Sequence, residues 1–358
     1  MSKRRVVVAM SGGVDSSLTA ALLKEAGYEV IGVTMRLWTE ERPDLPTYHR
    51  HCCSVEAIDD ARRVCQILGV PFYMMNFERQ FQSEVVDYFC YEYSRGRTPN
   101  PCIVCNQRIK FHLLLRKAVA LGADYLATGH YARIDRVDGK YRLLRASHPA
   151  KDQSYALFTL GQKELEHILC PLGDYRKADV RHLAMKLGLP VADKEESQEV
   201  CFIPDNNYRR FLSERLPSEP GEIFNVQGQE LGGHQGIAFY TVGQRHGLGL
   251  ALGKRLYVAK IDAARNALIV GSEDELLDNS LYANTVSYIS GQEPDKPTAI
   301  TAKIRYRSPE AAATLLPQGT GALVLFDQSQ RAITPGQAVV FYQGEVVLGG
   351  GIIEGKPT

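Results

Sequence analysis

The sequence has no long hydrophobic run and no excess of charge of either sign. No apolar stretch in the 358 residues approaches the roughly 18–20 residues that span a bilayer, so we expect no membrane partner. Forty-two Lys and Arg residues balance forty-one Asp and Glu, giving a net charge of +1. This balance excludes a globally basic nucleic-acid-binding protein but leaves room for a local basic surface.

The sequence also lacks a secretion signal and a disulfide framework. The apolar run at 6–10 follows three basic residues, but it is shorter than the about 7–15 residues of a signal core. We interpret it as a buried first strand and expect a cytoplasmic protein. Eight cysteines are too few for dense cross-linking at this length, and clustered cysteines in a reducing compartment more often bind metal or act in catalysis.

Short apolar runs alternate with helical periodicity through the first half of the chain. Buried strands are expected at 6–10, 30–35, 72–75 and 125–128, separated by helices after Ser16, from Val55, and around 81–89 and 109–121. Such alternation is typical of an α/β fold, here a Rossmann-like, mostly parallel sheet with helices on both faces. Ligands bind such sheets at the carboxyl ends of the strands.

Glycine-rich stretches and strand-like runs replace this pattern from about Asn207. The apolar or alternating runs at 302–307 and 338–342 predict strands, and 334–336 predicts a turn. We therefore expect a catalytic domain at 1–206, a small central domain at 207–276 and a C-terminal β-barrel domain at 277–358.

Residues 11–17, Ser-Gly-Gly-Val-Asp-Ser-Ser, lie between the expected first strand and first helix. The glycines permit positive φ, so backbone N–H groups can converge on an anion at the helix N-terminus. Asp15 would repel phosphates unless it binds Mg²⁺, which predicts a magnesium site. The alternative is a serine-capped helix after a glycine turn. The pattern resembles the pyrophosphate loop (PP-loop) of the ATP-pyrophosphatase superfamily, which implies an adenine nucleotide α-hydrolase-like domain that activates a carbonyl oxygen as its adenylate.

Cys102 and Cys105 form a Cys-x-x-Cys pair, expected in a loop just before a helix. Two sulfurs at this spacing suit redox chemistry or shared metal ligation, and Cys201 is a third candidate. The remaining cysteines on apolar stripes are interpreted as core: Cys65, Cys90 and Cys170. A polar loop holds a further group whose spacing does not favour zinc: His49, His51, Cys52 and Cys53.

Ordered motifs over essentially the whole chain resemble the tRNA-specific 2-thiouridylases (the MnmA/TrmU family). Besides the phosphate loop these are 96–101 with Cys105-Asn106, 127–131, 151–155, 201–203, 241–245, 305–307, 334–337 and 348–353. Family members install sulfur at C2 of the first anticodon uridine. ATP adenylates the base oxygen, sulfur attacks C2, and AMP leaves.

The resemblance implies a role for particular residues of this chain. ATP would be bound by Ala9, Met10, Ser11, Gly12, Gly13, Val14, Asp15, Ser16, Met35 and Gly129. The target base would be contacted by Asn100, Pro101 and Cys102, and the rest of the tRNA by Lys151, Asp152, Gln153, Arg305 and Tyr306. Cys105 matches the nucleophile and Cys201 the persulfide-carrying cysteine. A cysteine desulfurase or relay protein bearing a persulfide is then an expected partner, beside the anticodon stem-loop.

The run at 302–307 adds an observation of its own. Lys303, Arg305 and Arg307 alternate with apolar residues, so they are expected on one strand face. A solvated sheet edge would explain the same pattern, and the family resemblance favours phosphate contact.

Cys102 departs from the commonest family pattern, which has aspartate there. Two sulfur routes are open. Cys105 and Cys201 run a persulfide–disulfide cycle with Cys102 as a bystander or resolving thiol, or all three cysteines ligate a [4Fe-4S] cluster with one open iron. We favour the cluster, because a third thiolate beside the Cys-x-x-Cys pair makes a ligand triad.

Two other functions fit parts of the sequence. A different ATP pyrophosphatase, such as an amidating enzyme, would not need Cys105 or Cys201. A non-catalytic, ATP-gated tRNA-binding protein would bind tRNA without releasing AMP.

Overall fold

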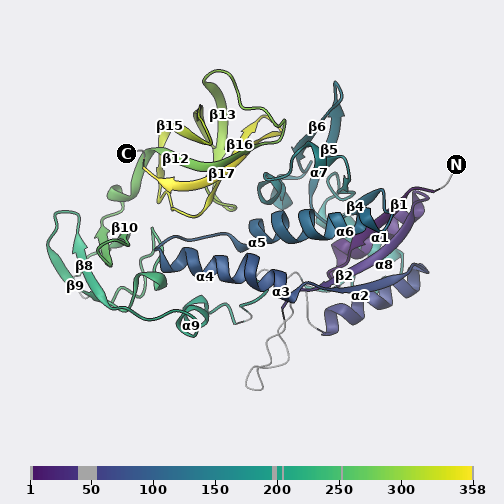
Figure 1. Cartoon of the computed structure of the whole chain (residues 1–358), viewed down its shortest axis with the longest axis horizontal. Helices are drawn as coiled ribbons and strands as arrows, with labels where there is room; N and C mark the ends of the chain where they lie inside the picture. Colours follow the sequence, from purple (N-terminus) through teal and green to yellow (C-terminus); the bar gives the residue numbers. More distant parts are fainter. Residues whose placement is uncertain (1–2, 39–54, 196–199, 204, 251–252, 357–358) are drawn as a thin grey trace.

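A computed structural model of the chain describes residues 3–38, 55–195, 200–203, 205–250 and 253–356. Its first half contains a parallel sheet in the order β3-β2-β1-β4-β7 (Figure 1). The strands are β1 (Arg5–Ala9), β2 (Glu29–Arg36), β3 (Phe72–Asn76), β4 (Tyr125–Ala127) and β7 (Ile168–Leu169). This arrangement confirms the predicted α/β, Rossmann-like domain.

Helices cover both faces of this sheet, because alternate side chains of β1 belong to different cores. Val6 and Val8 pack with residues of α1, α2 and α8, whereas Val7 packs with residues of the α4, η2 and α6 segments. The α-helices are α1 (Val14–Glu25), α2 (Val55–Leu68), α3 (Glu78–Phe81), α4 (Asp87–Ser94), α5 (Pro101–Val104), α6 (Leu115–Ala120), α7 (Gln162–Leu165), α8 (Lys177–Lys186) and α9 (Tyr208–Ser213). The π-helices are η1 (Gln82–Val86) and η2 (Cys105–Leu114), and the 3₁₀ turns are η3 (Pro149–Lys151), η4 (Ser154–Leu157), η5 (Ile237–Phe239) and η6 (Asp274–Leu276).

The prediction that the strand at 72–75 is buried is wrong. Tyr73 is 57% exposed and Met74 48% exposed. Among the described residues β3 pairs only with β2 and forms the edge of the sheet, so its side chains are less covered than those of the central strands.

The second half contains two further sheets. The first has the order β10-β11-β8-β9 and comprises β8 (Gly221–Asn225), β9 (Glu230–His234), β10 (Tyr257–Asp262) and β11 (Ala267–Gly271). The second closes into an antiparallel barrel through the pairing of β12 with β17, as expected. Its strands are β12 (Leu277–Tyr288), β13 (Thr298–Lys303), β14 (Ala311–Gln318), β15 (Gly321–Arg331), β16 (Ala338–Gln343) and β17 (Val346–Gly355).

A hairpin from the first half extends the sheet of the barrel. β5 (Ala132–Val137) and β6 (Lys140–Arg145) pair with each other, and Leu143 and Leu144 of β6 pair with β17. The barrel is therefore tied by backbone hydrogen bonds to the loop that leaves β4.

The prediction that Lys303, Arg305 and Arg307 share a strand face is also wrong. β13 ends at Lys303. Ser308 then closes a turn, since its N–H donates to the Arg305 carbonyl at 3.1 Å and its hydroxyl accepts from the Arg305 N–H at 3.2 Å. Arg305 and Arg307 lie in this turn.

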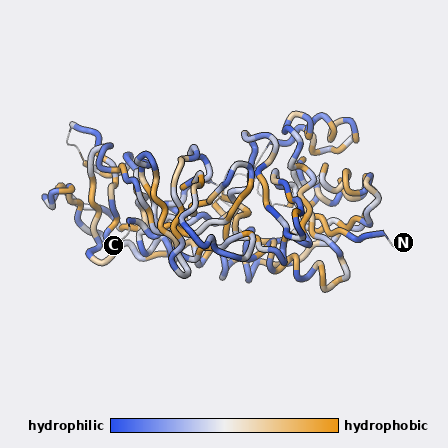
Figure 2. Tube along the Cα trace, turned by 90° about the horizontal axis from the view of Figure 1, so that it is seen from above, coloured by the Kyte–Doolittle hydropathy of each residue, from blue (hydrophilic) through white to orange (hydrophobic). Residues whose placement is uncertain are grey.

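Hydrophobic stretches run through the interior along the length of the molecule, while many of the outer turns are hydrophilic (Figure 2). Within the described ranges, no helix has both the length and the apolar character that crossing a membrane requires.

Candidate active site

The phosphate loop connects β1 to α1 at the carboxyl edge of the parallel sheet. Gly12 has φ +70, and a Cβ there would lie 2.1 Å from the Ala57 carbonyl oxygen of α2. The position therefore requires glycine on two grounds, its backbone conformation and its close approach to α2. Gly13 is the N-cap of α1 and has no side chain over the helix N-terminus.

Serine hydroxyls hold the shape of this loop. Ser16 Oγ accepts a hydrogen bond from the Ser11 N–H at 3.2 Å and donates to the Gly13 carbonyl at 3.1 Å. Ser17 Oγ donates to the same carbonyl at 2.9 Å. The loop is an ordered turn opening a helix, the geometry that binds anions.

The other predicted nucleotide residues lie at neighbouring strand ends. Met35 is near the end of β2, and Gly129 follows β4. A Cβ on Gly129 would lie 2.9 Å from the Asp15 backbone carbon and from the Ser16 nitrogen. The backbone after β4 thus packs directly on the first turn of α1.

Asp15 is held by two side chains from distant segments. Lys177, the first residue of α8, donates to both carboxylate oxygens at 2.7 Å, and the Tyr131 hydroxyl donates to Oδ1 at 2.6 Å. Lys177 already supplies the positive charge for which Mg²⁺ was invoked. The two carboxylate oxygens accept three hydrogen bonds between them, which leaves an acceptor position, so a magnesium site at Asp15 stays a prediction.

Lys194 contacts the phosphate loop itself, a role that its sequence context does not reveal. Its Nζ donates to the Gly12 carbonyl at 3.0 Å and pairs with Asp60 of α2 at 2.6 Å. Neither Lys177 nor Lys194 belongs to a recognisable sequence motif, so their contacts with the phosphate loop are found only from the folded structure.

Cys102 and Cys105 lie in a helix, and the prediction of a loop is wrong. Asn100 caps α5, its Oδ1 accepting from the Cys102 N–H at 3.1 Å and the Ile103 N–H at 3.3 Å, and Pro101 occupies the first turn. Both are favoured at a helix start. Cys102 is exposed and Cys105 is 7% exposed at the first residue of η2.

Cys201 packs against the hydrophobic cluster that contains Cys105. The adjacent Phe202 stacks edge-on with Phe81 and Phe89, at ring centroid distances of 5.8 and 5.3 Å. η1 lies between Phe81 and Phe89 in the chain and packs against both α5 and η2. The two cysteine segments therefore flank the same helical stretch, 78–94.

In the described part of the chain, no three His, Cys, Asp or Glu side chains are arranged to hold a metal ion. Cys102, Cys105 and Cys201 thus do not form a ready cluster site in this conformation. His49, His51, Cys52 and Cys53 lie outside the described residues, as do positions 197–199 of the motif before Cys201.

The cysteines interpreted as core are protected by burial. Burial raises the pKa of the Cys65 and Cys90 thiols to about 11 and that of Cys170 to about 12. These thiols stay protonated at neutral pH and are poor nucleophiles.

A chain of hydrogen bonds links the phosphate loop to the cysteine helix. Tyr131, whose hydroxyl binds Asp15, donates its N–H to Gln153 Oε1 at 3.0 Å. The Ala156 N–H donates to the Gln153 carbonyl at 2.9 Å, and the Ala156 carbonyl accepts from Asn106 Nδ2 at 3.1 Å. Asn106 directly follows Cys105, so this chain of hydrogen bonds connects the predicted ATP site with the predicted nucleophile.

The two stretches predicted to contact tRNA come together although they are far apart in sequence. Tyr155 and Tyr306 have ring centroids 5.9 Å apart. Asp152 accepts from the Ala146 N–H at 3.0 Å and from the Ser154 hydroxyl at 2.8 Å, so its carboxylate also orders the protein. Burial lowers the pKa of Lys303, and the charge of Asp152 opposes that effect, which places these two side chains near each other.

Segment 97–100 is where the three parts of the chain meet. Thr98 Oγ1 hydrogen-bonds to Thr241 Oγ1 at 3.1 Å, and the Thr98 N–H donates to the Pro335 carbonyl at 2.9 Å. Gln337 Nε2 donates to the Thr98 carbonyl at 2.7 Å. Both the small domain and the barrel therefore fix the position of Asn100.

Family comparisons cover the whole chain. A model described as tRNA methyl transferase HUP domain matches 4–205, tRNA methyl transferase PRC-barrel domain matches 209–272, and Aminomethyltransferase beta-barrel domain matches 278–353. The tRNA-specific 2-thiouridylase MnmA of Moorella thermoacetica is 56% identical over 353 residues, covering 97% of this chain and 99% of that protein. The protein of the same name from Clostridium perfringens is 49% identical over 99% of both chains.

Among solved structures, a 4-thiouridine synthetase–RNA complex with bound ATP is similar over 60% of this chain and 50% of that chain. The identity is 17% and the TM-score 0.38, so the likeness carries no functional argument.

Proposed function

Because the chain belongs to the family of the tRNA-specific 2-thiouridylases, we propose that its phosphate loop and its Cys105 helix together convert a tRNA uridine into 2-thiouridine. ATP activates the C2 oxygen of the base, and sulfur replaces that oxygen. The observation that carries the proposal is the hydrogen-bonded path from Asp15 through Tyr131 and Gln153 to Asn106. It joins an anion-binding turn to a helix bearing two cysteines.

In this proposal the phosphate loop binds the pyrophosphate end of ATP. Backbone N–H groups at the start of α1 face the β- and γ-phosphates, with Gly12 and Gly13 allowing their close approach. Lys194 and Lys177 lie beside the loop and offset the phosphate charge. Asp15 would offer its remaining carboxylate acceptor position to a Mg²⁺ ion carried by ATP.

The uridine C2 oxygen attacks the α-phosphorus, and pyrophosphate leaves with the electron pair of the α–β bridging bond. The base is then a good acceptor at C2, since AMP is a better leaving group than oxide. Asn100, Pro101 and Cys102 lie at the exposed start of the cysteine helix and are our candidates for contact with the base.

Cys201 carries the incoming sulfur as a persulfide in this proposal, and Cys105 is the nucleophilic thiol. The terminal sulfur is transferred to C2, and AMP departs with the original oxygen. The Cys105 thiolate attacks Sγ of Cys201, and the S–S bond of the persulfide breaks. The terminal sulfur leaves with the electron pair of that bond and attacks C2, and a Cys105–Cys201 disulfide remains. A thiol reductant or the donor's own thiols must then reduce this disulfide.

The [4Fe-4S] alternative remains a competing proposal. Cys102, Cys105 and Cys201 supply the right donor atoms for three irons, and such a cluster would present the incoming sulfur at its open iron. The present arrangement does not gather the three thiols, so we derive no step through a cluster. Iron and acid-labile sulfide content of protein purified without oxygen decides between the routes, and activity without iron excludes the cluster.

The proposed function is tested by single-turnover incubation of tRNA transcript with ATP, Mg²⁺ and a sulfur source. We expect 2-thiouridine, AMP and pyrophosphate in equal amounts. Cys105→Ser and Cys201→Ser should abolish 2-thiouridine while leaving tRNA affinity intact, and Cys90→Ser is the control because Cys90 is buried away from solvent. If the protein were an amidating enzyme or only bound tRNA, Cys105→Ser would leave that amidating activity or that tRNA binding unchanged.

A further inference from the structure

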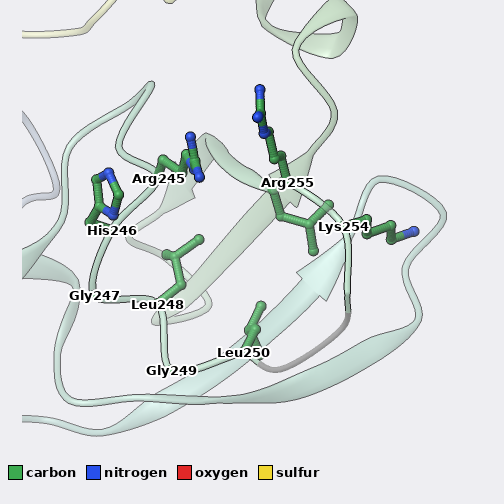
Figure 3. A pocket seen from close by; sticks show the side chains of 9 residues that line it. Arg245, His246, Gly247, Leu248, Gly249, Leu250, Lys254 and Arg255 are labelled. Atoms are coloured by element: carbon green, nitrogen blue, oxygen red, sulfur yellow. The ribbon is translucent and has the colours of Figure 1, made fainter.

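A basic hollow lies in the small domain, outside the site described above. It has a volume of about 380 Å³ and is formed by the loop that precedes β10 (Figure 3). Leu248 and Leu256 are buried in its lining. The rest of the lining comprises the half-buried Leu250, two glycines and four basic or titratable side chains: Arg245, His246, Lys254 and Arg255.

Three positive side chains at this hollow are exposed: Arg245, Lys254 and Arg255. Within the described residues, none of them has a carboxylate partner. Figure 3 shows the side chains of Arg245 and Arg255 pointing to the same side of the hollow, with His246 beside Arg245. The hollow therefore offers paired guanidinium groups whose charge is not balanced by the protein.

Arg209 supports the loop from behind and has an unused donor. Its guanidinium lies over the Tyr240 ring at 5.1 Å, and a Cβ on Gly247 would lie 3.0 Å from its Nη2. That Nη2 is buried and has no hydrogen-bond partner among the described residues. Because a buried N–H without an acceptor is costly, an acceptor that reached this donor would be stabilised.

Positive charge continues from the hollow to the barrel. A Cβ on Gly243 would lie 4.0 Å from Arg331 Nη1, and Arg305 Nη2 donates to the Arg331 carbonyl at 2.9 Å. Burial, and then the neighbouring charge of Arg331, lower the pKa of Arg305. Arg331 is itself paired with Glu273 at 3.0 Å, so the guanidinium groups of this boundary without a carboxylate partner among the described residues are Arg305 on the barrel side and Arg245 on the side of the hollow.

The same loop starts at the predicted target-base segment. Thr241 is hydrogen-bonded to Thr98, which lies two residues before Asn100. Four residues of extended chain span at most about 14 Å, so Arg245 lies within that distance of the contact. An RNA that places its base at Asn100 has neighbouring phosphates within reach of the hollow.

We propose that this hollow binds backbone phosphates of the tRNA, with Arg245 and Arg255 as the contacting residues, and so orients the anticodon stem while the base enters the active site. The proposal rests on the proposed function. A phosphate fits because planar guanidinium groups bind its oxygens in pairs. A polyanion spanning Arg305 and Asn100 also matches the positive charge at this boundary, whereas an acidic protein surface would need no such alignment. Phosphate contacts position an RNA without reading its sequence.

The test compares the Arg245→Ala/Arg255→Ala variant with the wild-type protein in tRNA binding at several salt concentrations. We expect an affinity loss of about tenfold or more at low salt and a plot of log K against log salt that is less steep by about one to two. kcat/KM for tRNA should fall with the affinity, whereas KM for ATP should not change. Arg265→Ala is the control, because Arg265 is an exposed arginine of the same domain that stacks on Phe224.

Wild-type affinity and salt dependence in the double variant would overturn the proposal, even if the wild-type enzyme makes 2-thiouridine as expected. A second outcome would also overturn the proposal. If the double variant binds tRNA normally but loses turnover only when a donor protein supplies the sulfur, the hollow binds that donor protein instead. If the wild-type protein makes no 2-thiouridine, the proposed function fails. The salt dependence then still decides whether the hollow binds RNA.

Discussion

Lys194 contacts the backbone of the phosphate loop from outside it, whereas Lys177 and Tyr131 contact the Asp15 side chain. The Lys194 Nζ holds the Gly12 carbonyl and Asp60 together, so Lys194→Gln should loosen the loop and remove a positive charge beside the phosphates. We expect KM for ATP to rise about tenfold, the worth of one charge-assisted hydrogen bond, with tRNA affinity unchanged. Lys194→Arg should recover part of the loss. Lys186→Gln, at the exposed end of α8, is the control, and an equal effect there would contradict this role.

His130 makes stability depend on pH. Burial, and then the charge of Lys110, lower the pKa of His130 from 6.5 to about 3. The unfolded chain binds a proton on this ring below about pH 6.5, whereas the folded chain does not. The stability due to the neutral ring is therefore complete above pH 6.5 and is lost as the pH falls toward 3.

This predicts that His130→Gln flattens the acid side of the stability profile. Between pH 6 and 4.5, the free energy of unfolding in urea should fall less steeply in the variant, by up to about 1.4 kcal/mol per pH unit. His182→Gln, on the exposed side of α8, should follow the wild-type slope. Parallel profiles for wild type and His130→Gln would show that the ring titrates alike in both states.

Some residues of the site could be predicted from the sequence and others could not, and the difference has a physical cause. The glycines and serines of the phosphate loop act through their own backbone, so their local pattern is informative. Lys177 and Lys194 act through the tips of long side chains from α8 and from the segment after it. The residues next to Lys177 and Lys194 in the sequence do not indicate that these lysines contact Asp15 and Gly12.

At the scale of elements, the start of the cysteine helix depends on Asn100. Its side chain caps two backbone N–H groups of α5, so Asn100→Ala should cost about 1 kcal/mol of stability. Asn100→Asp keeps the cap and should keep the stability. Thermal unfolding together with 2-thiouridine formation separates the two roles of this residue. Full activity in the aspartate variant assigns Asn100 to capping, and loss of activity without loss of stability assigns its amide to the base.

The elements that the sequence pattern predicted wrongly have different physical causes. The run at 72–75 is apolar enough for a central strand, but no strand of the described residues pairs with its outer side. The run at 302–307 alternates as a strand would, but Ser308 folds it into a turn. The third wrong prediction placed Cys102 and Cys105 in a loop. Asn100 and Pro101 just before them are both typical of a helix start and indicate the helix that the structure shows.

At the scale of the whole molecule, Arg97 joins the catalytic half to the barrel. It pairs with Glu92 of α4 and with Glu354 of β17, and the Arg97 and Glu92 side chains are 12% and 6% exposed. Arg97→Ala would leave Glu92 buried without its main partner and should cost roughly 3–5 kcal/mol of unfolding free energy. Arg95→Ala is a matched control, because Arg95 is 53% exposed and 3.8 Å from the same carboxylate; its loss should stay below about 1 kcal/mol. Equal losses in urea unfolding would contradict the bridging role.

Contacts across the molecule were the least predictable part of the fold. The barrel could be expected from its runs and turns, but the pairing of Leu143 and Leu144 with Val347 and Val346 could not. That pairing joins segments whose local patterns specify strands and not partners. The buried Tyr155 packs beside Tyr306, which brings together two stretches predicted to contact tRNA.

The central claim is that ATP activates the uridine C2 oxygen and sulfur then displaces it. It is tested most directly with an anticodon stem-loop that carries ¹⁸O at C2 of the first anticodon uridine, in a single turnover with ATP and a sulfur source. The account predicts one 2-thiouridine and one AMP containing a single ¹⁸O atom for each base converted. AMP without ¹⁸O, or 2-thiouridine formed without AMP, would contradict it.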